Sequence, residues 1–273
     1  NAGFARATNQ GIALARSEYV LVHNPDVAMR PDCLEQLVAF ADDHPAAGSF
    51  CPKLLGHPGG DELSATRSNG EILDAAGLRL TRSRVGRNRG EGERDRGQYD
   101  RAEEVFGAPG ACALYRRSSL VASVADGEFF DESFFAYKED VDLAWRLRLR
   151  GFAGWFVPTA IAYHRRSWRR PAGFGRRRLA LPANVRLLSL RNHLSLLVKN
   201  EQWPNLWRDG PFVAARVVGV LALLVLLEPW RWRTLRGWLS LVPSLRRKRQ
   251  SIQQGATATP AALRRWFGRV PPT

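Results

Sequence analysis

The chain has 273 residues, which is enough for one sizeable domain with an appendage or for two small domains. Its hydrophobic content of 45% excludes a collagen-like or broadly low-complexity chain. The net charge of +15 is unevenly distributed, since residues 1–164 contain 19 Lys and Arg against 23 Asp and Glu, whereas residues 165–273 contain 22 against 3. The basic, tryptophan-containing second half therefore predicts an anionic partner, either a membrane surface or a nucleic acid.

The cysteine pattern adds a further constraint. Cys33, Cys51 and Cys112 are odd in number and have no CxxC spacing. This argues against a disulfide framework and against a structural zinc site. The sequence instead predicts buried thiols in a reducing compartment.

Helix and strand patterns alternate at the start of the chain. Apolar residues recur at helical spacing over residues 4–16, and the apolar run 19–22 is typical of a buried parallel strand. Pro31 begins a second helical pattern that ends near His44, and residues 48–54 predict another strand. The order helix, strand, helix, strand indicates an α/β fold.

Shorter elements continue to about residue 165. Segments rich in Gly, Ser and charged residues predict exposed loops, and apolar runs between them predict strands. In chain order we expect an exposed loop over 56–70, a strand or hairpin arm over 71–80, an exposed loop over 81–104, a strand over 111–116 leading into a short helix, an amphipathic helix over 140–150 closed by Gly151, and strands over 153–157 and 160–163.

The second half has a different character. Residues 165–178 are rich in Arg, and residues 184–199 have a helical pattern. Residues 212–228 are the most apolar segment, but Arg216 leaves an uncharged run well short of the roughly 20 residues that span a bilayer. We therefore expect an interfacial or re-entrant helix, and a buried helix of a small helical subdomain is the alternative. The tail from Ser251 is expected to be disordered.

Carboxylates occur in two places where they could bind a ligand or take part in catalysis. Asp26 lies in a turn directly after a buried strand, where open α/β sheets bind ligands, although Asn-Pro-Asp is also an ordinary turn. Glu139, Asp140 and Asp142 begin a helix, where acidic residues stabilise the helix dipole but could also supply a general base. Asp140 is our choice for that base, with Glu139 supporting it.

Two further positions are candidates for ligand contacts. His164 follows a strand and could bind a metal or contact a diphosphate, although a lone histidine is usually structural. Gly3 and Asn9 flank a helix start, where a phosphate could bind.

The order and spacing of these groups form a recognisable set of motifs. They are N-x-G-F-A-x-A-x-N, then N-P-D-V after a hydrophobic strand, then G-A-x-A-L-Y-R-R, then F-D-E-x-F-F-x-Y-x-E-D-V-D-L-x-x-R-L, and finally G-x-x-x-x-x-V-P with a closing His. The set resembles the family 2 glycosyltransferases, which have the GT-A fold, and in particular their rhamnosyltransferase and galactofuranosyltransferase-like bacterial branch. The resemblance covers residues 1–165 closely.

The resemblance implies roles for individual residues. Asp26 and His164 are implied to bind a divalent metal, Mg²⁺ or Mn²⁺. Asp140 is implied to be the catalytic base of the Glu-Asp motif, next to Glu139. The remaining implied contacts are those to the donor by Gly3, Asn9, Asn24 and Asp26, and those to the acceptor by Gly110 and Ala111. Asn24 replaces a carboxylate of the family pattern, so that residue is not expected to bind the metal directly.

The resemblance also implies the organisation of the chain. Residues 1–165 would form a GT-A catalytic domain, a Rossmann-like mixed sheet flanked by helices, whose nucleotide-binding beginning precedes Asn1 and is missing. Residues 166–250 would form a basic, helical, membrane-associating region, followed by the disordered tail 251–273.

The implied function is inverting transfer of a sugar from a nucleotide-sugar donor to a cell-envelope glycan or a lipid-linked glycan. It would occur at an anionic membrane surface, on the cytoplasmic face of the bacterial inner membrane. A nucleic-acid partner is disfavoured because it leaves the ordered acidic motifs unexplained. A catalytically silent relative with a binding role is an alternative. A processive polysaccharide synthase is another, disfavoured because Q-x-x-R-W does not follow Asp140.

Overall fold

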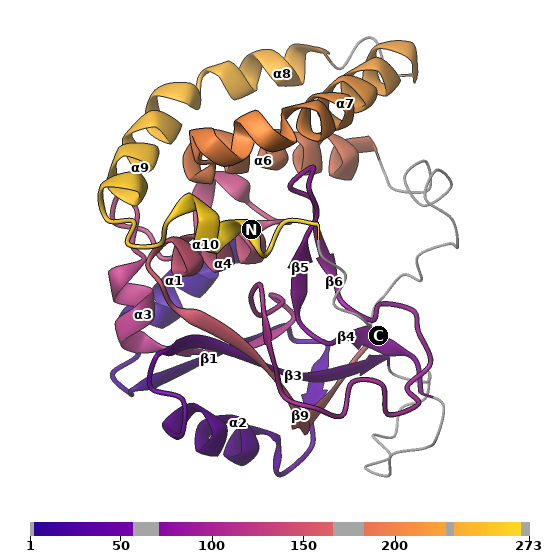
Figure 1. Ribbon diagram of the computed structural model, residues 1–273, viewed down its shortest axis with the longest axis vertical. Coiled ribbons are helices and arrows are strands. Elements are labelled where there is room, and N and C mark those ends of the chain that lie inside the picture. The colour runs from indigo at the N-terminus through magenta and orange to yellow at the C-terminus, as the bar shows by residue number, and fades with distance from the viewer. Residues whose placement is uncertain (1–2, 57–70, 166–182, 228–231, 269–273) are drawn as a thin grey trace.

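The structure is a computed structural model that describes residues 3–56, 71–165, 183–227 and 232–268. Its centre is a mixed sheet with strand order β1–β8–β3–β9–β2, to which β4 adds on β3 and β7 on β9 (Figure 1). The strands are β1 Tyr19–His23, β2 Val27–Met29, β3 Ala47–Gly56, β4 Leu73–Ala75, β7 Glu103–Val105, β8 Cys112–Arg116 and β9 Ala153–His164. β3 and β9 are parallel and the other pairs are antiparallel. The predicted mixed α/β sheet is confirmed.

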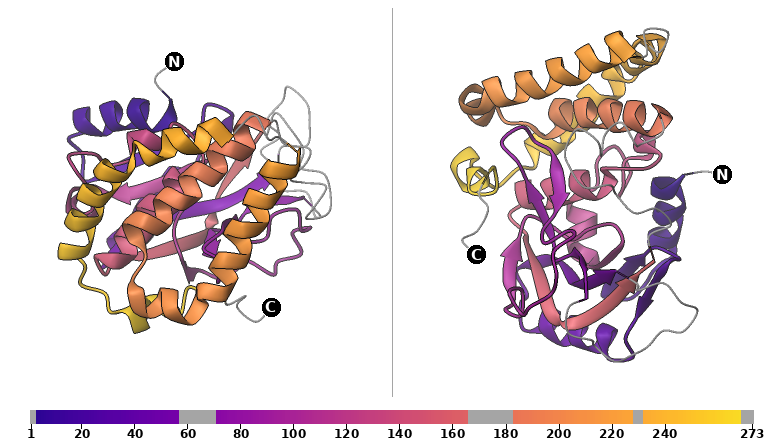
Figure 2. Two further views of the ribbon diagram at one scale, coloured as in Figure 1. Left: turned by 90° about the horizontal axis from the view of Figure 1, so that it is seen from above. Right: turned by 90° about the vertical axis from the view of Figure 1, so that its right-hand side faces the viewer.

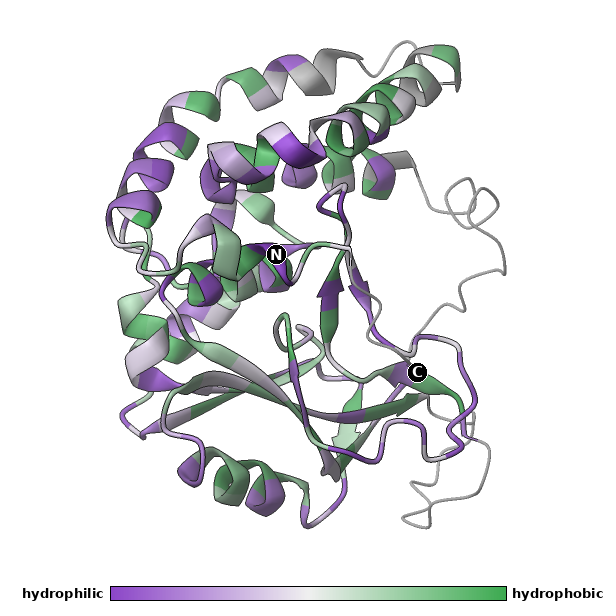
Figure 3. Cartoon of the chain, viewed as in Figure 1, coloured by the Kyte–Doolittle hydropathy of each residue, from purple (hydrophilic) through white to green (hydrophobic). Residues whose placement is uncertain are grey.

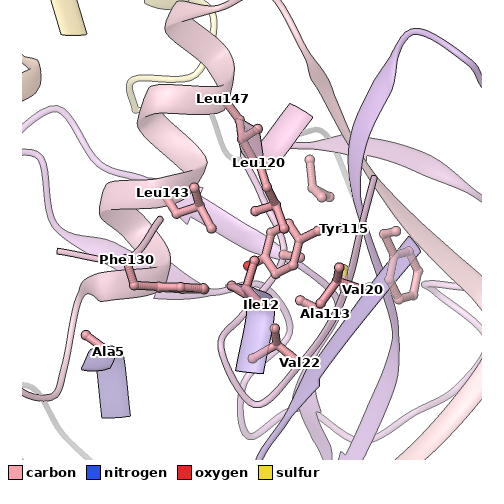
Figure 4. Packing of buried hydrophobic residues seen from close by; sticks show 14 of the residues in the cluster. Ala5, Ile12, Val20, Val22, Ala113, Tyr115, Leu120, Phe130, Leu143 and Leu147 are labelled. Carbon is pink, nitrogen blue, oxygen red and sulfur yellow. The ribbon is translucent and has the colours of Figure 1, made fainter. Parts of the chain in front are cut away.

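Helices cover both faces of this sheet. They are α1 Phe4–Leu14, α2 Cys33–Asp42, α3 Arg117–Ala122 and α4 Glu139–Leu149. α2 buries Leu37 against one face, because its apolar residues recur at helical spacing. On the other face, Ile12 of α1 and Leu143 of α4 pack with Tyr115 of β8 (Figure 4). The sheet therefore lies between two helical layers.

Hydrophobic residues concentrate along the strands and the inner helix faces, whereas α9 (Val242–Gln254) is largely hydrophilic (Figure 3). Cys33, Cys51 and Cys112 lie in the core as buried, free thiols, as the sequence predicted. Burial raises the pKa of Cys33 and of Cys112 to about 12, so both thiols stay protonated at neutral pH.

The C-terminal helices form a further layer at the end of the molecule away from α2 (Figures 1 and 2). They are α6 Ala183–Asn200, α7 Trp203–Leu227, α8 Trp232–Leu239, α9 and α10 Pro260–Arg264. α6 packs against both α4 and α9. The helix predicted over 184–199 is confirmed, and it lies directly on the helix that begins with Glu139.

Buried ion pairs join this layer to α4. Lys199 of α6 lies 2.9 Å from Oδ1 of Asp142 and also contacts Asp131. Lys248 of α9 is 2.7 Å from the other oxygen of Asp131. Arg146 completes the pairing of Asp142 at 3.0 Å. Because removing one member leaves an unpaired buried charge, these contacts fix how the C-terminal helices sit on the sheet domain.

Three sequence predictions fail, wholly or in part, in the described residues. The exposed loop predicted over 81–104 is wrong for its first part, since β5 (Leu78–Leu80) and β6 (Gly86–Asn88) form a hairpin with a buried Arg84 at its tip, whereas residues 91–102 lie outside the helices and strands and are mostly exposed. Arg84 can be buried because it pairs with Glu201 and Asp209, which neutralise its charge. The composition of the segment alone does not reveal these partners.

The tail is also ordered as far as residue 268. The Thr259 side chain accepts from the Ala262 amide and caps α10, and Phe267 packs on Trp145 with ring centroids 5.7 Å apart. The two predicted strands before His164 form one strand, β9. Its pairing with β3 jumps from Val157 to Ile161, so the residues around Pro158 bulge outward without ending the strand.

The apolar segment that begins at residue 212 belongs to α7, a helix of 25 residues that also contains Pro211. Val213 and Val220 are buried, whereas Trp203 and Trp207 are exposed. In the parts of the chain that the structure covers, we find no helix with both the length and the apolarity that crossing a bilayer requires. Most of the predicted loop 56–70 and of the Arg-rich stretch 165–178 lies outside the described residues.

Candidate active site

A cavity of about 450 Å³ opens where the N-terminus of α4 meets the turn after β1 and the β5–β6 hairpin. The hairpin approaches α4 closely because residue 86 is glycine, since a Cβ there would lie 2.3 Å from a methyl carbon of Val141. The predicted site residues that line the cavity are Asn24, Asp26, Gly110, Ala111, Glu139, Asp140 and His164. Residues from four separate motifs of the sequence therefore meet in one place.

Asp26 and His164 are neighbours because β2 pairs with the end of β9. Val27 lies opposite His164 in this pairing, so the residue before Val27 lies beside the imidazole. Nε2 of His164 is 3.3 Å from Oδ1 of Asp26, and Nδ1 is 2.8 Å from Oδ2 of the buried Asp74. The imidazole thus lies between two carboxylates.

This arrangement fits a cation beside Asp26. If the Nδ1 hydrogen is donated to Asp74, Nε2 presents a lone pair toward a carboxylate oxygen, and two acceptors at 3.3 Å need a positive charge between them. A second proton on His164 or a divalent ion would supply that charge. Within the described ranges, no three His, Cys, Asp or Glu side chains are arranged to hold a metal. Asp26 and His164 would therefore provide two ligands, and other oxygens would complete the set.

Asp140 lies at the first turn of α4 and faces the cavity. Its Oδ2 accepts from the Gly110 amide at 3.0 Å and its Oδ1 from the Val141 amide at 2.8 Å. Burial raises the pKa of Asp140, although these amides favour the charged form. A carboxylate held in this way at the cavity suits the transfer of a proton from a bound hydroxyl.

Glu139 is buried beside Asp140. Burial, and next the charge of Asp140, raise the pKa of Glu139 to about 8. Its Oε2 atom has no hydrogen-bond partner among the described residues. Glu139 lines the cavity, but this oxygen is buried, so a proton held on it would account for the increased pKa better than a bound ligand would.

The third carboxylate of this motif has a different position. Asp142 is fully buried and contacts Lys199, Arg146 and the Asn200 side chain. Burial alone would raise its pKa, but Lys199 and Arg146 hold the pKa below its usual value. Asp142 does not line the cavity, so the structure separates it from Glu139 and Asp140.

Gly3 and Asn9 are not among the cavity-lining residues. Asn9 is buried and bonds both to the carbonyl and to the amide of Phe130, which fixes α1 to the loop before α4. Gly3 has φ of 82° and precedes Phe4, which does line the cavity. Gly3 therefore lies next to a lining residue, and Asn9 holds the loop before α4, but neither of them lines the cavity itself.

Sequence reasoning missed several residues of the site. Asp74 was not singled out, although a carboxylate between apolar neighbours in a predicted strand is a usable signal. Arg87 and Asn88 line the cavity from a segment interpreted as an exposed loop. Tyr137 and Lys138 line it just before the Glu-Asp motif. These four residues reach the cavity because of the β5–β6 hairpin and the conformation of the loop before α4. The spacing of residues in the sequence indicates neither feature.

Part of the chain is similar to known proteins. Residues 1–122 match the sequence profile described as Glycosyl transferase family 2. Two curated relatives, from the CDC 1551 / Oshkosh and ATCC 25618 / H37Rv strains of Mycobacterium tuberculosis, are both named N-acetylglucosaminyl-diphospho-decaprenol L-rhamnosyltransferase. Each is 28% identical, over 61% of this chain and 57% of the relative. The chain therefore spans little more than half the length of these relatives.

The fold has a counterpart among solved structures. The crystal structure of GalNAc-T7 with UDP, GalNAc and Mn²⁺ matches with a TM-score of 0.52, over 89% of this chain and 44% of that one. At 12% identity this similarity shows the fold alone. Residues 1–122 are therefore similar to the family 2 glycosyltransferases, and the fold of the chain resembles that of GalNAc-T7, with a mixed, GT-A-like sheet flanked by helices.

Proposed function

We propose that the protein is an inverting glycosyltransferase that moves a sugar from a nucleotide-sugar donor to a lipid-linked glycan of the cell envelope. One observation carries the proposal: a single cavity contains the Asp140 carboxylate at a helix N-terminus together with the Asp26–His164 pair. These are the two groups that the reaction needs, a base for the acceptor and a site for the charged leaving group.

Asp140 takes the proton of the acceptor hydroxyl as the hydroxyl attacks the anomeric carbon from the side opposite the leaving group. The Gly110 and Val141 amides hold its two oxygens in place, and each oxygen keeps a lone pair for the proton. Gly110 also leaves room beside the base, because a Cβ there would lie 3.3 Å from that of Asp140. Gly110 and Ala111 line the cavity there and border the acceptor.

Asp26 and His164 are proposed to hold Mg²⁺ or Mn²⁺ near the donor diphosphate. When bound, such an ion neutralises the negative charge that develops on the departing nucleoside diphosphate. Asp74 keeps the imidazole oriented through its bond to Nδ1. Asn24, which lines the same part of the cavity, contacts the donor, while Gly3 and Asn9 contribute by fixing α1.

The acceptor is proposed from the relatives and from the surface of the C-terminal helices. The mycobacterial relatives are named for transfer to a sugar on a polyprenyl diphosphate, a membrane lipid. Trp203 and Trp207 of α7 are exposed, and α7 belongs to the helical layer at the end of the molecule away from α2 (Figure 2). Exposed tryptophans beside arginines such as Arg208 suit the headgroup region of an anionic membrane. We therefore place the protein at the cytoplasmic face of the inner membrane, without a nucleic-acid partner.

The deciding experiment measures nucleoside diphosphate release and sugar transfer from a panel of nucleotide sugars led by dTDP-rhamnose and UDP-sugars. Polyprenyl-diphosphate-linked N-acetylglucosamine is the acceptor, with and without Mn²⁺ or Mg²⁺. Metal-dependent transfer that gives an inverted anomeric linkage, and that is lost in Asp140→Asn, supports the proposal. A folded protein that binds nucleotide sugars but transfers none would instead be a catalytically silent family member.

A further inference from the structure

The backbone just before α4 is strained. Phe135, Tyr137 and Lys138 have φ of 58°, 70° and 73°, a region that residues other than glycine rarely adopt. The Ala136 amide donates to the Phe134 carbonyl at 2.6 Å, which closes a three-residue turn of the rare positive-φ kind around Phe135. Such a conformation persists only where the surrounding structure holds it.

Of the large side chains in this segment, only that of Phe134, at its start, is fully buried. The side chains of Phe135 and Tyr137 are 44% and 41% exposed. Hydrogen bonds to the backbone carbonyls hold the segment. The Phe4 amide donates to the Phe135 carbonyl at 2.9 Å, and the Asp142 amide donates to the Lys138 carbonyl at 2.9 Å.

The Asn192 side chain of α6 donates hydrogen bonds to the other three backbone carbonyls of the segment. Its Nδ2 atom lies 3.0 Å from the Phe134 oxygen, 2.9 Å from the Ala136 oxygen and 2.8 Å from the Tyr137 oxygen. Two amide hydrogens are thus shared among three acceptors. Asn192 is completely buried, so water does not compete for these bonds.

The segment that Asn192 holds is also a wall of the active site. Ala136, Tyr137 and Lys138 line the cavity, and Glu139 and Asp140 follow directly in the chain. A change of backbone direction here would turn the first residues of α4 relative to Gly110. A displacement of about 1 Å at a reacting group can cost on the order of 100-fold in rate.

We propose that Asn192 is a positioning residue for the transfer reaction. It holds residues 134–138 in a conformation in which Phe135, Tyr137 and Lys138 have positive φ, and this fixes the direction in which α4 presents Asp140 to the cavity. The effect of Asn192 on catalysis rests on the proposed function, whereas its role in holding the loop does not. The site is accordingly incomplete without α6, which also contributes Ser189 to the lining of the cavity.

Hydrogen exchange of the Asn192→Ala protein tests the holding of the loop. The amides of residues 134–138 are expected to exchange at least about tenfold faster than in the wild type, while those of β3 keep their protection. Asn200→Ala is the matched control, because Asn200 is an equally buried asparagine of α6 that bonds the Asp142 side chain instead. It should lower the melting temperature without exposing residues 134–138.

Kinetics of the same pair tests the effect on catalysis. In Asn192→Ala, kcat should fall by about 10- to 100-fold with little change in KM for the donor, and Asn200→Ala should keep kcat near wild type. If Asn192→Ala does not fold, Asn192→Asp keeps the shape of the side chain but lacks the donor hydrogens and gives the same comparison. Unchanged exchange over 134–138, or a loosened loop with wild-type kcat, would overturn the proposal. If the wild type transfers no sugar, the proposed function fails, and the exchange pattern still decides whether Asn192 holds the loop.

Discussion

Nδ1 of His164 is 2.8 Å from a carboxylate oxygen of Asp74, on the edge of the ring away from Asp26. This bond fixes the orientation of the ring and determines which nitrogen faces the cavity. Asp74 belongs to β4 and His164 to β9, and both strands pair with β3. The central strand of the sheet therefore sets the distance between them.

Replacing Asp74 with Asn should weaken binding of Mn²⁺ together with a nucleoside diphosphate by about 10- to 100-fold, because the imidazole loses its fixed tautomer and basicity. Isothermal titration calorimetry of Mn²⁺ in the presence of nucleoside diphosphate measures this without requiring turnover. Asp43→Asn, at an exposed position at the end of α2, is the control and should bind as the wild type does. Wild-type affinity in Asp74→Asn would show that this bond has no role in metal binding.

Asp140→Asn should abolish sugar transfer, by a factor of about 100 or more, while leaving donor binding intact. The amide keeps an oxygen that can accept from Gly110 or Val141 but cannot take a proton from an acceptor. Transfer rates and donor affinity, measured on one preparation, separate the two effects. Substantial turnover in this variant would move the base assignment to another group, with Glu139 the first to examine.

Glu139 should make folding stability depend on pH. Its pKa of about 8 lies above the usual value of 4.5, so the folded protein retains a proton there that the unfolded chain has lost. Stability is therefore lost as pH rises from about 4.5 to about 8. Glu139→Gln should remove this loss, raising the melting temperature at pH 9 by several degrees and at pH 5 by much less. Glu35→Gln, an exposed change on α2, should show no such pH-dependent difference.

Asp142 should behave as a structural residue despite its place in the motif. Asp142→Asn leaves Lys199 and Arg146 short of a buried counter-charge and should cost about 3–5 kcal/mol in the free energy of unfolding, measured by urea denaturation. Asp126→Asn breaks an exposed pair with Arg247 and should cost less than about 1 kcal/mol. Equal stability of the two variants would contradict the structural role of Asp142.

Membrane binding should depend on the outer face of α7. Trp203 and Trp207 are 67% and 82% exposed, and changing both to Ser should reduce sedimentation with anionic vesicles while the melting temperature stays unchanged. Leu14→Ser on α1 removes an equally exposed apolar side chain and is the control. Wild-type binding should also weaken at high salt, because the arginine contribution is screened. If the double variant binds vesicles as well as the wild type does, this face of α7 is not the membrane-binding surface.

The elements with clear periodicity were predictable from the sequence. α2, β1, β3 and α6 lie within a few residues of their expected positions, because burial of one helix face or of a whole strand leaves a regular apolar pattern. The strand or hairpin arm expected over 71–80 contains β4 and β5, but the second arm of the hairpin, β6, was missed, and so was α10. Arg84 is charged yet buried, and its partners Glu201 and Asp209 lie more than a hundred residues away in the chain. Local composition cannot show such compensation.

The site was partly predictable for a similar reason. Motif order identified Asp26, Asp140 and His164, and the cavity brings all three together. The motif could not distinguish Asp142 from its neighbours, because the difference lies in Lys199, which a separate helix supplies. Asn192 had no local signal either, since its partners are carbonyls of a distant loop.

The segregated charge of the sequence has a consequence for how the molecule is assembled. Asp131 and Asp142 lie in the half of the sequence that a ribosome synthesises first, whereas Lys199 and Lys248 follow later. Until those lysines are synthesised, Asp131 lacks both of its lysine partners, Asp142 has only Arg146, and the loop before Asp140 lacks Asn192. The growing chain can therefore form its sheet early but acquires its working active site only when the C-terminal helices close over it. Part of the surplus positive charge of the second half thus neutralises carboxylates in the interior of the protein.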